Sequence, residues 1–213
     1  MQTRDKSEQG TIEAIGQGAV SATPDVAILR LGVTTEAKKP ADAAKQNAER
    51  MNKVLEAIKK VGIKEEAIQT WGMRLQPVMK WDEADNKHVL LGYRADNIIT
   101  VRTPVERAGE VYDAGIQGGA NAAGGIMFSL QDETKYRRDA LMIATQRAVE
   151  EIQVVADTIG ATLIGPVQAQ VMSSGSYHRP MSGLALEKAA ADTPVLPGQL
   201  EIDAQVRVVF AIK

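Results

Sequence analysis

The chain has 213 residues, 44% of them hydrophobic and 4% aromatic, which is typical of a globular protein with an aliphatic core. Its 25 basic and 27 acidic residues nearly cancel, and no basic excess indicates nucleic-acid binding. The lack of cysteine excludes disulfides, thiolate nucleophiles and Cys-ligated zinc, and no apolar run of about 18 residues predicts a transmembrane helix.

The N-terminal residues 1–10 are polar and lack the apolar centre of a signal peptide, so we expect a disordered lead-in. Residues 11–18 and 25–37 alternate as strands do. At the end of the first, Gly16 and Gly18 form a GxG, but a dinucleotide fingerprint needs a further Gly or Ala and then a helix. Position 21 is serine and a strand follows Pro24, so the glycines predict a hairpin corner.

Residues 41–61 change to a helical period, with Pro40 suited to the first helical turn and Gly62 to the left-handed residue that ends a helix. The apolar face expected of this helix consists of Ala44, Ala48, Met51, Leu55 and Ile58. Strands are predicted over 66–79 and 89–102, joined by a charged turn over 80–88.

Thr103, Pro104 and Glu106 have the spacing of a capping box, which predicts a helix running to about residue 116. A short strand over 126–131 precedes a long helix over 133–159, which Gly160 ends. The apolar stripe expected on this helix consists of Leu141, Ala144, Ala148, Ile152, Val155 and Ile159. Strands follow over 163–172 and 199–212, separated by an irregular segment over 173–198.

The long strands are polar on one face and apolar on the other, whereas strands buried on both faces read as continuous apolar runs. The predicted class is therefore α+β, with antiparallel or mixed sheets, amphipathic helices packed on one face, and imperfectly repeated strand–helix–strand units. Residues 11–213 are expected to form one domain, with two intimate subdomains as the alternative organisation.

Two segments are candidates for protein interfaces. Trp71, Met73, Met79 and Trp81 alternate on one strand, where core packing is the favoured interpretation and an exposed strip for self-association is the alternative. The segment 173–198 is either a disordered insertion or an arm that docks on a neighbouring subunit. Its contact-prone residues are Tyr177, His178, Arg179, Met181 and Leu184.

No constellation predicts catalysis, a cofactor or a metal site. His88 and His178 are far apart and lack ligand spacing. The acidic turn of Asp82, Glu83 and Asp85 lacks the ligand order of a calcium loop, and the serines near His178 lack a nucleophile elbow. These observations favour a non-enzymatic role.

Several stretches together resemble the SIMPL-domain family over about residues 10–213. They are GQGAVSATPDVAILRLGV, AIKKVGI, IQTWGMRLQPV, GYRADNIITVR, the long helix with its A-x3-A repeats, and QVRVVFAIK. The family includes bacterial periplasmic proteins linked to oxidative-stress defence. The resemblance implies an exported, oligomeric α+β protein of a Gram-negative-type envelope, and it brings no catalytic residues.

The function expected from the sequence is that of a non-enzymatic envelope protein that self-assembles and acts as a scaffold or stress-protective interaction module. Its expected partners are further copies of itself and other envelope proteins. The expected location is periplasmic or secreted, with the signal peptide removed, rather than cytoplasmic. The alternative is a small-molecule-binding protein or enzyme with a pocket between the repeated units.

Overall fold

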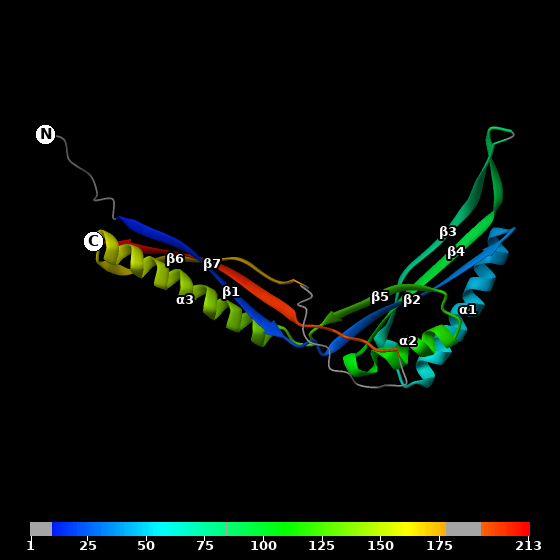
Figure 1. The fold of residues 1–213 in the computed structure, drawn as a ribbon, viewed down its shortest axis with the longest axis horizontal. Coiled ribbons are helices and arrows are strands. Elements are labelled where there is room, and N and C mark those ends of the chain that lie inside the picture. The colour runs from blue at the N-terminus through cyan, green and yellow to red at the C-terminus, as the bar shows by residue number, and fades with distance from the viewer. Residues whose placement is uncertain (1–9, 84, 178–192) are drawn as a thin grey trace. The chain divides into compact units, whose positions relative to one another are not determined.

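A computed structural model of the protein describes residues 10–83, 85–177 and 193–213 (Figure 1). The described residues form two compact units. The first unit contains β1 (Thr11–Ala22), α3 (Thr134–Ile159), β6 (Leu163–Tyr177) and β7 (Leu200–Ile212). The second contains β2 (Val26–Ala37), α1 (Pro40–Lys60), β3 (Ile68–Asp82), β4 (Lys87–Pro104), α2 (Ala108–Gln117) and β5 (Ala122–Ser129).

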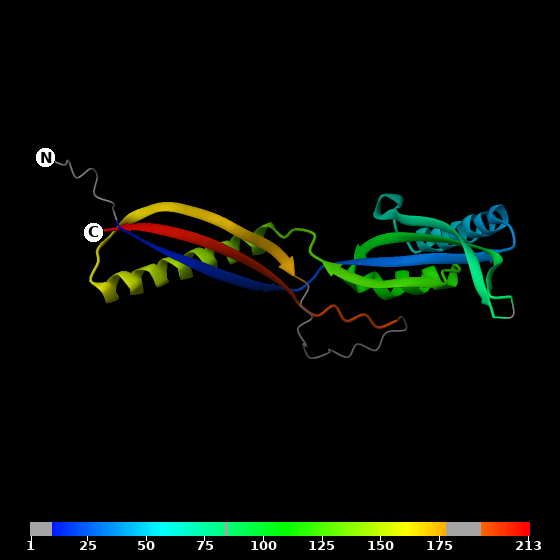
Figure 2. The ribbon, with the colours of Figure 1, turned by 90° about the horizontal axis from the view of Figure 1, so that it is seen from above.

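The first unit is a three-stranded antiparallel sheet in the order β1-β7-β6, with α3 along one face (Figure 2). The alternation in β7 turns Ile202, Val206 and Val208 toward the helix, and all three are buried. Gly16 and Gly18 of β1 lie beneath the backbone of α3, where a Cβ would collide with Ala144 and Ala140. Glycine in β1 therefore lets helix and strand approach closely.

The second unit is a four-stranded antiparallel sheet in the order β3-β4-β2-β5. Helices α1 and α2 cover one face, which we call the covered face, and the other is the open face (Figure 1). The core between sheet and helices includes Leu29, Leu31, Val54, Ile58 and Val111, all fully buried. Full burial of each such side chain contributes about 1.5–3 kcal/mol to stability.

Asn47 is a buried polar residue of α1 that faces this sheet. Its Nδ2 donates hydrogen bonds to the carbonyl oxygens of Val33 in β2 and Ala95 in β4, each at 2.8 Å. Both strands are thus tied to α1 through one side chain, which fixes the helix over the middle of the sheet.

The predicted α+β class, with helices on one face of each sheet, is confirmed. The long helix occupies Thr134–Ile159 and ends at Gly160, whose φ of 74° is left-handed as expected of a helix stop. The predicted helix over 41–61 and strand over 199–212 are likewise present within one or two residues.

The predicted faces of the helices are only partly right. In α1, Met51 and Ile58 are buried as expected, together with Ala43, Asn47 and Val54. In α3, the buried stripe keeps strict spacing of four residues, so Val155 and Ile159 lie outside it and are exposed. The stripe consists of Ala140, Ala144, Ala148, Ile152 and Ala156.

Two local predictions are wrong. Gly16 and Gly18 are not a hairpin corner: they lie inside β1, and β1 and β2 belong to different sheets. The capping box is also absent, because β4 continues through Pro104 and α2 begins at Ala108 with no side-chain cap. Thr103 instead pairs with Ala27 in the sheet, and its hydroxyl is buried.

Candidate interaction surface

The hairpin of β3 and β4 extends beyond the N-terminal end of α1, so its outer part is not covered by the helix (Figure 1). Residues directly opposite each other on paired strands share a face. Leu75 is opposite Ala95, which is buried under the helices, and the alternation places Met73, Met79 and Trp81 on the same covered face as Leu75. Leu90 joins them as the partner of Met79.

We call Met73, Leu75, Met79, Trp81 and Leu90 the apolar strip. Met73 is 75% exposed and the other four are 46–49% exposed. The interpretation of Met73, Met79 and Trp81 as core residues is therefore wrong. Contiguous apolar surface of this kind is uncommon on a monomer and is typical of protein-interaction sites.

The hairpin is shaped by two irregularities in its pairing. One lies between Thr70 and Gly72 and the other between Val78 and Met79. At the tip, Trp81 contacts His88 edge to face, with ring centroids 5.0 Å apart. Asn86 adopts a φ of 48°, a conformation that asparagine tolerates better than most residues.

Trp71 does not belong to the apolar strip. The bulge at Thr70 and Gly72 turns it to the open face, where the guanidinium carbon of Arg30 lies 4.8 Å from the ring centroid. Trp71 itself is 58% exposed, so the predicted core position is wrong here as well. Strict alternation could not reveal the pairing with Arg30, because a bulge reverses the side on which a residue points.

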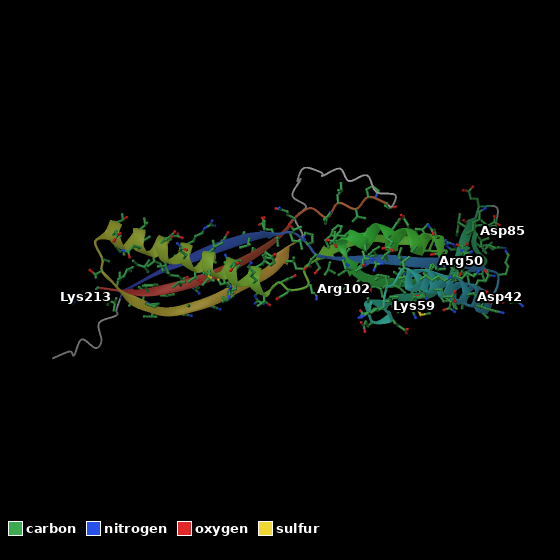
Figure 3. All side chains as sticks on the ribbon, turned by 90° about the horizontal axis from the view of Figure 1, so that it is seen from below. Asp42, Arg50, Lys59, Asp85, Arg102 and Lys213 are labelled. Carbon is green, nitrogen blue, oxygen red and sulfur yellow. The ribbon has the colours of Figure 1, made fainter. Side chains whose placement is uncertain are left out.

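A depression of about 290 Å³ lies between α1 and the strands β3 and β4. Its floor is apolar, from Met51, Leu55 and Ile99, and its rim includes Asn97, whose Oδ1 is buried without a hydrogen-bond partner. Figure 3 labels Lys59, which lies on α1 at the rim.

Ion pairs on these surfaces are exposed. Lys59 Nζ lies 2.8 Å from Glu65 Oε2, and this hydrogen bond lowers the pKa of the Glu65 carboxyl. Near the start of α2, the Glu110 carboxylate raises the pKa of the Arg107 guanidinium. The Lys59–Glu65 pair lines the depression between α1 and the strands β3 and β4, whereas Arg107 and Glu110 are not among its lining residues.

Of the contact-prone residues predicted in the segment 173–198, the structure describes Tyr177. Tyr177 is the last residue of β6 and pairs in register with Glu201. His178, Arg179, Met181 and Leu184 lie outside the described residues. Further along, Thr193 donates hydrogen bonds to the Asp113 carboxylate of α2 through its amide and its hydroxyl.

Within residues 10–83, 85–177 and 193–213, no three His, Cys, Asp or Glu side chains are grouped as metal ligands. Across the same residues, no helix is both long enough and apolar enough to cross a membrane. Sequence reasoning missed Arg30, Leu75 and Leu90 as surface features. Arg30 follows the alternation of the strand predicted over 25–37, but nothing local in the sequence indicates its aromatic partner.

The protein is of the α+β class, with two antiparallel sheets that each carry helices on one face. Its candidate site is a surface, the apolar strip on the hairpin of β3 and β4. The chain belongs to the SIMPL family, described as "Protein of unknown function (DUF541)", which matches residues 12–210. It is 29% identical to the 26 kDa periplasmic immunogenic protein of Brucella melitensis, covering 97% of this chain and 86% of that protein. It is also 28% identical to YggE of Escherichia coli K12, over 93% of this chain and 81% of that protein.

Proposed function

We propose that this protein is a non-enzymatic envelope protein that self-assembles and serves as a scaffold or stress-protective interaction module. The apolar strip is the observation that carries the proposal, because removing it from water favours association by roughly 25 cal/mol per Å². A periplasmic location is supported by the name of the Brucella relative, the 26 kDa periplasmic immunogenic protein. Other envelope proteins are the further partners proposed.

The side chains of the strip, rather than the backbone edge of β3, are the proposed contact. β3 is an edge strand, but it contains Pro77, Lys80 and two irregularities of pairing. Proline, lysine and bulges are the usual devices that stop an edge from pairing with another strand. An assembly built on β3 would therefore bury its side-chain face.

The test is light scattering after size-exclusion chromatography over a hundredfold range of protein concentration. The wild type is expected to elute as an oligomer, and Met73→Ser/Trp81→Ser as a smaller species with unchanged circular dichroism. The matched control is Met142→Ser/Val154→Ser, which removes two side chains on α3 that are 63% and 64% exposed. A wild-type monomer throughout, or equal assembly of all three proteins, contradicts the proposal.

A second candidate function is the binding of a small molecule in the depression between α1 and β3–β4. The unpaired Asn97 Oδ1 favours it, because a buried acceptor without a donor is unfavourable by about 1–3 kcal/mol. A thermal-shift screen of metabolites and metal ions should then find a stabiliser that Asn97→Leu no longer responds to. A screen with no stabiliser contradicts this candidate.

A further inference from the structure

The open face of the sheet in the second unit carries three arginines that form no ion pair with any residue the structure describes. The register places Arg30 of β2, Arg74 of β3 and Arg102 of β4 on this face, and Figure 3 labels Arg102. Two carboxylates on this face are engaged elsewhere: Glu36 lies 2.7 Å from Arg94, and Asp96 accepts a hydrogen bond from Thr34.

Arg30 is held in place rather than free to move. Its guanidinium stacks over Trp71, and its Nε is buried without a hydrogen-bond partner. On the other side, a Cβ at Gly124 would lie only 2.9 Å from the Arg30 Cβ, so the side chain is closely confined. A guanidinium fixed in this way loses little entropy when it pairs with a carboxylate.

An acidic counterpart lies on the other sheet of the same chain. Glu201 and Asp203 of β7 point away from α3, because their neighbours Ile202 and Ala204 are buried beneath it. Neither has an ion-pair partner among the described residues, whereas Arg207 on the same face is paired with Glu13. Ile15, 42% exposed, is opposite Arg207 and therefore lies farther along the same face.

The spacing of the two charge pairs matches. Glu201 and Asp203 are two residues apart on one strand, so their Cα atoms are roughly 7 Å apart. Arg102 is opposite Ile28, so it is the diagonal neighbour of Arg30 at about 7–8 Å. Two arginines and two carboxylates at the same spacing can form two bidentate ion pairs at once, the strongest class of charged hydrogen bond.

We propose that a second copy of this chain docks the Glu201–Asp203 end of its β7 onto Arg30 and Arg102 of the first, beside Trp71. The contact joins two different surfaces, so each copy has one of each to offer. This inference rests on the proposed self-assembly and adds a second, charged contact to that of the apolar strip.

The first experiment reverses the charge of one face at a time, as Arg30→Glu/Arg102→Glu and as Glu201→Arg/Asp203→Arg. Each is expected to weaken assembly on the order of a hundredfold in sedimentation or light scattering, while circular dichroism stays unchanged. Lys45→Glu/Lys53→Glu on α1 makes the same charge change as the first variant on the other side of the same unit and should assemble like the wild type. Arg30→Gln/Arg102→Gln replaces the first variant should it fail to fold.

The second experiment mixes the two charge-reversed proteins. Their reversed faces are complementary to each other, so the mixture should form a complex that neither forms alone, and added salt should weaken it. Variants that assemble like the wild type, or a mixture that forms no complex, overturn this contact while leaving the apolar strip untouched. A wild type that is monomeric at every concentration overturns the proposed self-assembly and this inference together.

Discussion

Gly16 of β1 lies directly against Ala144 of α3: a Cβ built on this glycine would be 1.8 Å from the Ala144 carbonyl oxygen. Gly18 has the same relationship to Ala140, at 2.1 Å. In both cases the obstacle is helix backbone, which cannot rotate away as a side chain can. The GxG of the sequence is thus matched to the alanine spacing of a helix that follows more than a hundred residues later.

Gly16→Ala should therefore destabilise the protein by about 3 kcal/mol, the upper part of the range for overpacking, because the helix must move away from the sheet. The measurement is urea unfolding followed by circular dichroism. Gly165→Ala in β6 of the same sheet is the control, since a Cβ there meets nothing within 4 Å and its φ is not positive. Equal stability of the two variants would contradict the close packing of α3 on β1.

Asn47 supplies the next prediction. Asn47→Leu removes both of its hydrogen bonds and leaves the carbonyl oxygens of Val33 and Ala95 without this donor in a buried position. A loss of about 2–4 kcal/mol is expected, since each deprived buried group is unfavourable by about 1–3 kcal/mol. Gln46→Leu, at the neighbouring exposed position of α1, should change the free energy of unfolding by less than about 0.5 kcal/mol.

Helices α1 and α3 and strand β7 were predictable because their signals are local. Apolar spacing, Gly62 and Gly160 mark the helices, and strict alternation marks β7. The same local reasoning misread Gly16 and Gly18, because a glycine needed for a turn and a glycine needed for helix packing look alike in one sequence. Only the pairing of distant segments separates the two.

The interaction surface was predictable in composition but not in arrangement. The apolar and aromatic residues of β3 stood out, yet burial was the favoured interpretation because α1 could have covered them. The hydrogen bonds from Asn47 to β2 and β4 help to position α1 along the sheet. No local sequence pattern predicts these bonds, so the part of the hairpin that α1 leaves exposed was not predictable. The bulge beside Trp71 is equally invisible, so its stacking with Arg30 could not be foreseen.

Asp132 gives a pH-dependent prediction at the start of α3. The Thr134 hydrogen bonds to its carboxylate, among them the Thr134 amide at 2.8 Å, lower the pKa of Asp132 in the folded protein. A depressed pKa means that the stabilisation is complete above the unfolded pKa of about 3.9 and is lost as the pH falls through the folded value.

Asp132→Ala should accordingly lower the melting temperature at pH 7, and the difference from wild type should shrink progressively below about pH 4. Melting curves recorded by circular dichroism between pH 7 and pH 2 measure it. Gln46→Ala on the exposed side of α1 is the control, because it removes no ionisable group and should show no such convergence. A difference that stays constant down to pH 2 would contradict the role of the carboxylate.

A substitution at Thr103 tests whether this residue caps a helix or belongs to strand β4. A capping threonine replaced by valine loses its hydrogen bond to the helix, which destabilises a protein by about 1 kcal/mol. Here Thr103 is 3% exposed, pairs with Ala27, and its hydroxyl has no hydrogen-bond partner. Thr103→Val removes a buried unpaired polar group while keeping the shape and the β-branched side chain, so stability should stay the same or rise by up to about 1 kcal/mol.

Thr100→Val, on the neighbouring open face of β4, is the control, because its hydroxyl is hydrogen-bonded to the Gln69 carbonyl and should not give the same gain. Urea unfolding of the three proteins decides the matter: a loss of about 1 kcal/mol in Thr103→Val would restore the capping box and place the start of α2 earlier in the chain.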